Sequence, residues 1–539
     1  MKSSTSEFDF KSSVIPFPVA GASTEIPSKE RIGSKAHNLM RMAALGLPVP
    51  PGFVVCTDLC HAFLQHGWRA LDALFPELNR ALHQLGETTG RHFGDPRRPL
   101  LVSVRSGAAV SMPGMMETIL NIGLNRITAK GLVRLTGNPR LAADCRRRLV
   151  SQYGEVVAGI PPQVFASQLQ DFLDAHKVSA LDELDSAGLM QLAELFENTF
   201  AVTCGTRFPA DPLIQLNHAV GAVLNSWCSK QAETYRRIHS IADDIGTAVI
   251  VQAMVFGNQG PTSGAGVGFT RNPADGTNAL YVDYLANAQG EDVVSGRRVA
   301  MGPEELQRRA PAAYQTLLAA RGMLEREFAE MQDFEFTVED GRLLLLQTRC
   351  GKRTPLAALR IARDLVAEGL ITPPVAIARL KEYDLEAIEE VRLANQNEQP
   401  LLHGTAAGAG VAVGAAVFDP ARVHSMRQSN KDVVLVCENA ETSDIEALAE
   451  ASALISSSGA RTSHAAVVAR QLGKPCVVGC AGLVIAADAR SAWFGDQRLI
   501  EGDLLSVDGE RGVIYRGALD VIRQRPVELL DSVASWGST

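Results

Sequence analysis

The stretch SSSGARTSHAAVVARQLGKPCVVGC, residues 456–480, places a single histidine, His464, directly before a run of alanine and valine. Thr462 and Ser463 are residue types that cap helices, and AAVVARQL is apolar enough to pack as a short helix. The Gly-Lys-Pro that follows predicts the end of this helix, and CVVGC is typical of a buried strand. We therefore expect His464 at the N-terminus of a helix, in a small α/β unit.

The position predicted for His464 has a chemical consequence. Free amide N–H groups and the helix dipole favour an anion at a helix N-terminus. A histidine there is disfavoured as a cation and tends to remain a neutral nucleophile, which suits a carrier of a phosphoryl group. A lone histidine is more often a capping or packed residue, so the rest of the chain has to decide between these readings.

Composition limits the classes of function. A chain of 539 residues predicts three or four domains, and 46% hydrophobic with 21% charged residues is typical of a globular protein. The net charge of −8 gives no electrostatic reason to expect nucleic acid or an anionic membrane as a partner. The sequence starts with polar residues and has no apolar run of about 20 residues, and its nine cysteines form no CxxC pair. These features predict a cytoplasmic protein with reduced thiols. The basic run Arg146–Arg148 is expected on a solvated helix face.

The chain is predicted to be a multi-domain α/β protein. Short apolar strands alternate with helical stretches after a loose start, a helical segment broken at TPP follows, and a Gly- and Ala-rich stretch opens the part that contains His464. We expect a loose leader (1–30), a mixed α/β domain (31–353), a helical linker (354–399), a small α/β domain (400–520) and a C-terminal tail (521–539).

If His464 accepts a phosphoryl group, the preceding region should bind a nucleotide. The P-loop pattern GxxxxGK[ST] is absent from the sequence. Lys35 follows a Gly-Ser turn in IGSKAHNL, and Arg105 lies at a strand end before the glycine-bearing loop of SVRSGAAVSMPGMMET. Cations and loop N–H groups of this kind can bind a triphosphate.

Two alternating pairs predict a metal–phosphate site on a hairpin. Asp333 and Glu335 in MQDFEF share one face of a strand, and Gln347 and Arg349 in LLQTR have the same spacing on the strand paired with it. Two carboxylates suit Mg²⁺, and the amide and guanidinium suit phosphate. Taken singly, each could be a turn cap or a solvated strand face, but together with the His464 stretch they favour a nucleotide site.

At these residues the chain resembles the family of pyruvate, phosphate dikinase and, more broadly, the phosphoenolpyruvate (PEP) synthase group of histidyl phosphotransfer enzymes. The resemblance covers about residues 30 to 520. Its most specific stretch is TSHAAVVAR with GKPC, and it extends to NLMRMAALGLPVPPGFVV, LLVSVRSGAAVSMPGMMETILNIGLN, GTAVIVQAMVFGNQGPTSGAGVGFTRNP, NAQGEDVVSGRR and MQDFEFTVEDGRLLLLQTRCGKRT.

The resemblance implies an ATP-grasp nucleotide-binding domain, a helical linker and a swivelling phosphohistidine domain. Matching motifs imply that His464 is the phosphocarrier and that the stretch from Met112 to Met116 folds over the phosphates of ATP. The resemblance implies that Lys35, Arg105 and Arg349 contact the ATP phosphates. Asp333, Glu335 and Gln347 are implied to lie at the nucleotide and its Mg²⁺, with Asp333 and Glu335 as the metal ligands. Met112 and Gly114 belong to the loop implied to cover the phosphates. ATP and Mg²⁺ are thus the implied cofactors, and inorganic phosphate is the implied co-substrate.

The sequence departs from the family pattern in two places. The family continues into a (β/α)₈ barrel that binds pyruvate or PEP, and such a barrel needs about 250 residues, more than follow GVIYRG at 512–517. We therefore expect the acceptor half-reaction to occur on another chain, such as a barrel protein, or on a different substrate, or not at all. SSSGARTSH replaces the usual TARGGMTSH, so Arg461 is either a cation beside the phosphohistidine or a surface residue. Thr462 matches a threonine that is phosphorylated by a regulatory protein in some dikinases, although a capping role is the simpler reading.

The leading hypothesis is a dikinase-type ATP:histidine phosphotransferase that converts ATP and phosphate into AMP, pyrophosphate and phosphohistidine, and passes the phosphoryl group to pyruvate or another acceptor. A second hypothesis is a PEP synthase-like enzyme, or a phosphotransferase acting on hydroxyl groups of small molecules, that uses water in place of phosphate. A third is a regulatory protein that binds nucleotide without turnover. The sequence leaves the oligomeric state open, with a homo-oligomer among the options.

Overall fold

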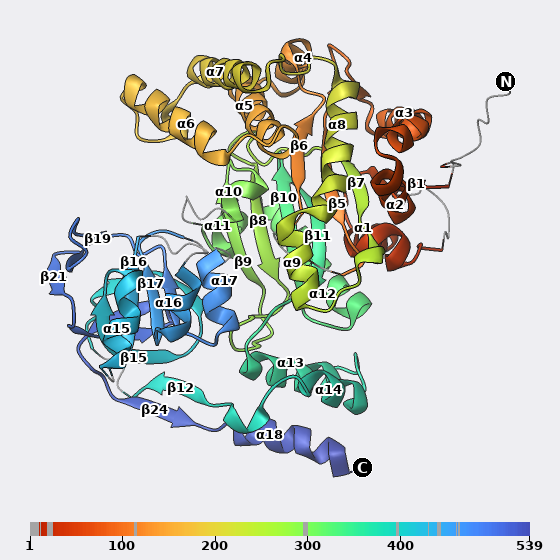
Figure 1. Cartoon of the computed structure of the whole chain (residues 1–539). Coiled ribbons are helices and arrows are strands. Elements are labelled where there is room, and N and C mark those ends of the chain that lie inside the picture. Colours follow the sequence, from red (N-terminus) through yellow and green to blue (C-terminus); the bar gives the residue numbers. More distant parts are fainter. Residues whose placement is uncertain are drawn as a thin grey trace, which may run out of the picture. The chain divides into compact units, whose positions relative to one another are not determined.

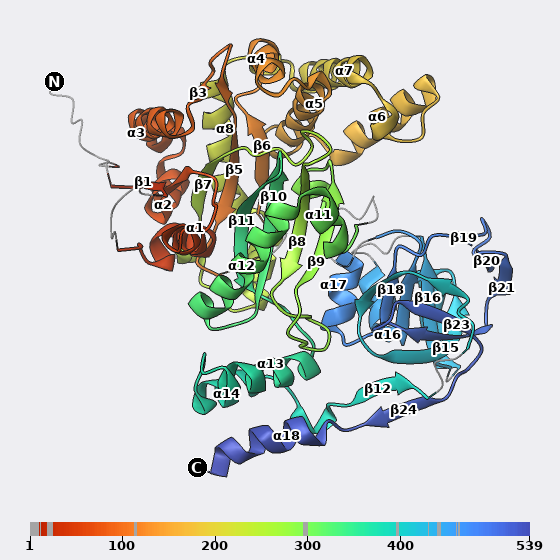
Figure 2. The same ribbon diagram turned by 180° about the vertical axis from the view of Figure 1, so that it is seen from behind.

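The computed structural model describes the chain in two compact units. One unit comprises residues 1–255 with 344–347, and the other comprises residues 256–343 with 348–539. Figures 1 and 2 label many of the helices and strands. No helix in the described part of the chain has the length and apolar character needed to cross a membrane. The described residues are 10, 12–18, 25–110, 112, 116–294, 300–394, 398–429, 431–438, 444–459, 461 and 464–538.

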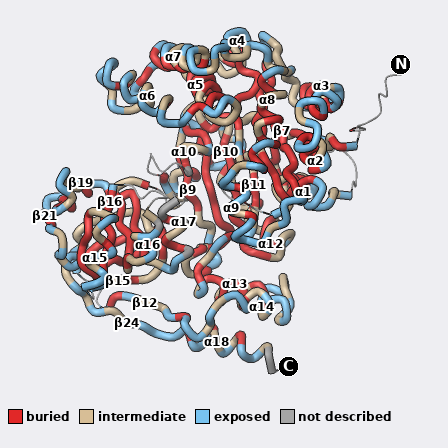
Figure 3. The backbone as a smooth tube through the Cα atoms, viewed as in Figure 1, coloured by how far each residue is buried: buried red, intermediate tan, exposed pale blue. Residues whose placement is uncertain are grey.

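A five-stranded antiparallel sheet forms the centre of the first unit, in the order β1-β2-β7-β5-β6. β2 and β7 are buried along their whole length because GFVV and AVIVQA carry mostly apolar side chains, many of them β-branched. Figure 3 shows β7 in the colour of buried residues. The structure differs from the predicted loose leader at β1, which pairs with β2. The strands are β1 (Val14–Phe17), β2 (Gly52–Val55), β5 (Val102–Gly107), β6 (Thr118–Ile122) and β7 (Ala248–Ala253).

Helices of the first unit follow the predicted apolar stretches, with a break at Gly67. This glycine has φ 59° and ends one helix before the next begins at Trp68. A short parallel pair, β3 (His92–Phe93) with β4 (Pro99–Leu100), lies outside the main sheet. The helices are α1 (Lys29–Ala44), α2 (Thr57–His66), α3 (Trp68–Thr89), α4 (Arg126–Thr136), α5 (Pro139–Val156), α6 (Pro162–His176), α7 (Ser186–Cys204), α8 (Pro212–Asn225) and α9 (Lys230–Ile238).

The basic run in α5 is not a solvated face, contrary to the prediction. Arg146 is 3% exposed and donates to Glu197, and Arg147 is 8% exposed and donates to Asp144. Buried arginines require such acidic partners, because an unpaired charge inside a protein is costly. The run therefore ties α5 to α7 and stabilises the helical layer.

In the second unit, a four-stranded sheet has the order β11-β10-β8-β9. β10 and β11 form the predicted hairpin, with Asp340 and Gly341 in the turn at φ 47° and 76°. The strands are β8 (Gly264–Phe269), β9 (Tyr281–Ala286), β10 (Gln332–Glu339) and β11 (Arg342–Cys350), and the neighbouring helices are α10 (Gly290–Val294), α11 (Pro303–Arg309) and α12 (Pro311–Phe328).

An eight-stranded sheet holds the part of the second unit that contains His464. Its order is β13-β23-β22-β15-β16-β17-β18-β14, and apolar clusters cover both faces. Strands β15 to β18 pair in parallel, as expected for a sheet packed against helices. The elements are β13 (Leu402–His403), β14 (Thr405–Gly408), β15 (Val411–Val417), α15 (Val423–Gln428), β16 (Val433–Cys437), α16 (Ile445–Glu450), β17 (Ala453–Ser456), α17 (His464–Gln471), β18 (Cys476–Val478), β19 (Leu483–Ile485), β20 (Ser491–Phe494), β21 (Gln497–Ile500), β22 (Leu504–Asp508) and β23 (Val513–Arg516), of which β19–β21 form a separate three-stranded sheet.

The segment 354–399, which is expected to be a helical linker, contains a strand in addition to its helices. After α13 (Pro355–Ala367) and α14 (Pro373–Leu380), strand β12 (Glu390–Leu393) pairs with β24 (Val521–Gln524) from the predicted tail. Helix α18 (Val527–Ala534) then packs on α13 and α14, so the chain leaves and re-enters this helical group through a two-stranded ribbon (Figures 1 and 2). A mixed α/β, multi-domain fold is thus confirmed.

Candidate active site

A kink in α1 brings the GSK turn onto the end of strand β5. Gly33 has φ 74° and ψ 157°, which breaks the helical geometry. The backbone N–H and the hydroxyl of Ser34 both donate to the carbonyl of Ala108, at 2.9 and 3.0 Å. A Cβ atom at position 33 would lie 1.9 Å from the carbonyl oxygen of Gly107, so only glycine allows this close approach.

Lys35 of α1 lies beside the face of β5 that carries Arg105. A Cβ atom on Gly107 would lie 3.8 Å from the Cβ atom of Lys35, and alternate residues of a strand share a face, so Arg105 is on that side. The Arg105 guanidinium donates to the backbone carbonyl of Leu346 and to Oε1 of Gln347, both at 3.3 Å. The first unit therefore gathers two cations and an amide beside β5, and Arg105 lies within this strand rather than at its end as predicted. Such a set is suited to binding phosphate.

The second unit pairs two other predicted residues. Nε of Arg349 donates to Oδ2 of Asp333 at 2.8 Å, and the Asp333 carboxylate is 7% exposed. Burial raises the pKa of Asp333, while the charge and the hydrogen bond of Arg349 act in the opposite direction. Glu335, two residues further on β10, is half-buried and on the same face.

Mg²⁺ fits the donor set of β10. Asp333 and Glu335 supply hard oxygen atoms from one strand face, and Mg²⁺ is usually bound by one or two carboxylates together with substrate phosphates and water. The described residues contain no group of three or more His, Cys, Asp or Glu that could enclose a metal ion. The carboxylate pair suits a metal ion that is also held by the phosphates of a nucleotide.

Helix α17 begins at His464, as the sequence predicts. Gly473 follows the helix with φ 65°, and β18 is buried at each of its three residues. The side chain of His464 and the two expected capping residues, Thr462 and Ser463, lie outside the described part of the chain. Backbone N–H groups of the first turn of a helix have no partner within the helix and can receive an anion.

The predicted loop over the phosphates is described only in part. Met112 is 6% exposed. Gly114 lies outside the described residues. The structure thus brings the predicted residues into two groups, with Lys35, Arg105 and Gln347 in the first unit and Asp333, Glu335 and Arg349 in the second.

Strand β9 contributes residues that the sequence analysis did not identify. Tyr281 and Asp283 alternate in YVDYLA, and through the β8 register they lie on the sheet face that carries Asp333 and Glu335. Asp283 is 2% exposed, and a carboxylate buried this deeply usually has a cationic partner. The signal in the sequence is an acidic residue within the otherwise apolar run YVDYLA.

Comparison with known proteins gives two matches to family models. Residues 69–311 match the model described as pyruvate phosphate dikinase, AMP/ATP-binding domain, and residues 429–512 match the PEP-utilising enzyme, mobile domain. Pyruvate, phosphate dikinase of Clostridium symbiosum is 40% identical over 496 residues, which cover 91% of this chain and 56% of that protein. Pyruvate, phosphate dikinase 2 of Zea mays is 42% identical over 492 residues, again 91% and 56%.

A third relative, pyruvate, phosphate dikinase of Entamoeba histolytica, is 41% identical over 495 residues. The chain spans about half the length of these relatives, 56% in each of the three. The matched domain models contain the strand of Arg105 and the helix of His464, respectively. The chain is therefore similar to pyruvate, phosphate dikinases over 91% of its length, and this similarity includes the regions that match the AMP/ATP-binding and mobile domain models.

Proposed function

We propose that this chain is an ATP:histidine phosphotransferase of the dikinase type. A nitrogen of the His464 imidazole attacks the β-phosphorus of ATP, the bond from that phosphorus to the α–β bridging oxygen breaks, and AMP leaves. An oxygen of inorganic phosphate then attacks the γ-phosphorus, the bond from that phosphorus to the β–γ bridging oxygen breaks, and pyrophosphate leaves. The β-phosphoryl group remains on His464. The observation that carries the proposal is the start of α17 at His464, within the region that matches the mobile domain of PEP-utilising enzymes.

Each group of predicted residues has a role in this proposal. Lys35 and Arg105 hold the phosphates and offset the negative charge that builds up on them, and Gln347 keeps the Arg105 fork in place. Asp333 and Glu335 would hold Mg²⁺, which would offset the negative charge of the phosphates. Arg349 orients Asp333 through its 2.8 Å hydrogen bond. The loop of Met112 and Gly114 covers the phosphates.

The phosphohistidine domain transfers its phosphoryl group to a second site, so it has to move. The ribbon of β12 and β24 connects the eight-stranded sheet to the helical group, and we assign the hinge to it together with the stretch near residues 354–405. The acceptor is pyruvate or another molecule that receives the phosphoryl group at that second site. The bounds 31–353, 354–399 and 400–520 remain our proposal for the domains.

Position-specific labelling of ATP tests the proposal. With Mg²⁺ and phosphate, β-³²P-ATP should leave alkali-stable, acid-labile label on His464, and γ-³²P-ATP should place its label in pyrophosphate. Free phosphate as the labelled product of γ-³²P-ATP would instead support the water-dependent route. A His464→Ala variant that still acquires acid-labile label would reject the assignment of the phosphocarrier, and nucleotide binding without AMP release would support the regulatory alternative.

A further inference from the structure

A charged contact joins the segment just before His464 to strand β9. Nε of Arg461 lies 3.7 Å from Oδ1 of Asp283, and the Asp283 side chain is 2% exposed. The guanidinium carbon of Arg461 lies 4.6 Å from the centre of the Tyr281 ring. An arginine can pair with a carboxylate and stack on an aromatic ring at the same time, which a lysine does less well.

Further contacts fix the same segment. The Tyr281 hydroxyl donates to the carbonyl of Ala406 at 3.0 Å. Arg470, a buried residue of α17, donates to the carbonyl of Ala407 at 3.1 and 3.2 Å and to the backbone carbonyl of Arg461 at 2.8 Å. Helix α17 and the backbone of Arg461 are therefore held together, so a contact made by the Arg461 side chain also restrains the start of the helix.

This contact lies on a particular face of the β11-β10-β8-β9 sheet. Asp333 of β10 and Tyr281 of β9 both lie opposite Phe269 of β8. In the same way, Glu335 of β10 and Asp283 of β9 both lie opposite Val267. Residues opposite each other in antiparallel strands point to the same side. The side chain of Arg461 thus approaches the face that carries the two carboxylates assigned to Mg²⁺.

We propose that Arg461 is a positioning residue that holds the start of α17 on strand β9 while His464 receives its phosphoryl group. This inference rests on the proposed function. The ion pair with buried Asp283 and the stacking on Tyr281 restrain the histidine at the nucleotide-binding sheet, and the contact has to break before the phosphorylated domain can leave. The two readings of Arg461 that the sequence left open, a cation near the phosphohistidine or a surface residue, are thereby replaced by a third.

Single-turnover transfer from β-³²P-ATP to His464 tests this role. Arg461→Ala should slow labelling by about 10–100-fold, since loss of alignment in the reacting pair costs about that much. The dissociation constant for ATP should stay within about twofold, because the variant affects placement of the acceptor histidine. Arg461→Lys should recover part of the rate, as it keeps the charge opposite Asp283 but loses most of the stacking.

A double-mutant cycle assigns the effect to the pair. Asp283→Asn alone should slow labelling, and the Arg461→Ala/Asp283→Asn double variant should be no slower than Arg461→Ala, since both changes remove one interaction. Arg427→Ala is the matched control, because Arg427 pairs with Asp432 within the same sheet domain, far along the chain from α17. Its labelling rate should equal that of the unchanged protein.

Three outcomes would overturn the inference. They are an unchanged labelling rate in Arg461→Ala, additive effects in the double variant, and a loss of ATP affinity in Arg461→Ala as large as its loss of labelling rate. Small-angle X-ray scattering keeps the inference testable should the unchanged protein acquire no label, a result that would reject the proposed function. Arg461→Ala should then still increase the radius of gyration relative to Arg427→Ala. An unchanged radius would show that Arg461 holds nothing in place.

Discussion

The guanidinium of Arg105 donates to Oε1 of Gln347 at 3.3 Å, which fixes a cation of β5 by an amide of β11. Gln347 is 8% exposed, so its side chain has little freedom to turn away. The amide carries no charge and leaves the positive charge of Arg105 available to a phosphate. A carboxylate at position 347 would neutralise that charge.

This relationship predicts a graded series of effects on ATP affinity. Arg105→Ala should weaken binding by about 10–100-fold, because charge-assisted hydrogen bonds contribute about 1.5–3 kcal/mol. Gln347→Glu should also weaken binding, while Gln347→Met, which removes the hydrogen bond but adds no charge, should have a smaller effect. Isothermal titration calorimetry measures all three. Equal affinities for the Glu and Met variants would contradict the charge argument.

Two glycines with nearly equal φ separate backbone strain from close packing. Gly33 has φ 74° and its added Cβ atom would lie 1.9 Å from the carbonyl oxygen of Gly107, whereas Gly46 has φ 75° and nothing within 4 Å. Gly46→Ala should cost about 1 kcal/mol of unfolding free energy from the left-handed conformation alone. Gly33→Ala should cost more and should also weaken ATP binding, because the clash displaces the turn that carries Lys35. Urea unfolding and calorimetry of both variants check this, and similar losses in the two would refute it.

Local signals in the sequence predict much of this structure. The β10–β11 hairpin follows from a turn sequence between two alternating strands, and α17 follows from a helix-forming run that ends at Gly473. Both depend on residues close together in the chain. The same holds for the alternation that places Asp333 and Glu335 on one strand face.

Pairings between distant segments have no such local signal. β12 and β24 lie far apart in the sequence and have only four residues each, so neither could be recognised alone. The contact of Arg461 with Asp283 likewise spans two domains of the family pattern. The kink at Gly33 reads as a turn before a helix, and only its close approach to Gly107 shows why glycine is required there.

Helix α18 packs on α13 and α14 with one face only, so substitutions on its buried and exposed faces should differ in their effect on stability. Leu529 of α18 is 6% exposed and packs in a cluster with Ala358 and Leu359 of α13, whereas Val527 of the same helix is 57% exposed. Leu529→Ala should lower the unfolding free energy by about 2–4 kcal/mol through lost burial and a residual cavity. Val527→Ala should change it by less than about 0.5 kcal/mol. Chemical denaturation followed by circular dichroism compares them, and equal effects would mean that α18 does not dock on α13.

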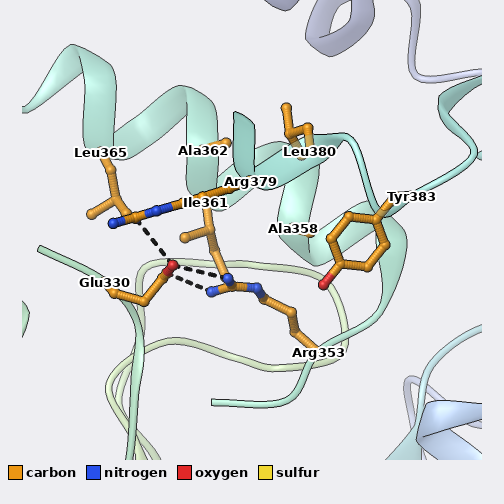
Figure 4. A pocket seen from close by; sticks show the side chains of 9 residues that line it. All are labelled: Glu330, Arg353, Ala358, Ile361, Ala362, Leu365, Arg379, Leu380 and Tyr383. Atoms are coloured by element: carbon orange, nitrogen blue, oxygen red, sulfur yellow. Dashed lines mark hydrogen bonds and ion pairs between the residues drawn. The ribbon is translucent and has the colours of Figure 1, made fainter. Parts of the chain in front are cut away.

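An ion cluster beside α13 and α14 predicts how stability depends on pH. Glu330 accepts hydrogen bonds from both terminal nitrogens of Arg353 and lies 3.0 Å from Nη1 of Arg379 (Figure 4). Burial by itself would raise the pKa of Glu330, but the hydrogen bonds and charges of the two arginines outweigh it, and the pKa lies below the ordinary 4.5. The ionised form therefore favours the folded state.

The sign of this effect gives a measurable pH window. The stabilisation by Glu330 is fully present above about pH 4.5 and is lost as the pH falls through the lowered pKa of the folded protein. Glu330→Gln should cost about 3 kcal/mol at pH 7, because it leaves two arginines without their buried partner. The difference from the unchanged protein should shrink as the pH falls below about 4.5, the ordinary pKa of a glutamate.

The control for this prediction is an exposed ion pair of the same region. Glu389 pairs with Arg523 at 3.4 Å, and both side chains are more than 40% exposed. Glu389→Gln should change stability by less than about 0.5 kcal/mol at any pH in that window, because solvent screens the pair. Urea unfolding at several pH values measures both variants. A Glu330→Gln difference that stayed constant as the pH fell below about 4.5 and through acid unfolding would show that the cost arises from packing rather than from the charge of the carboxylate.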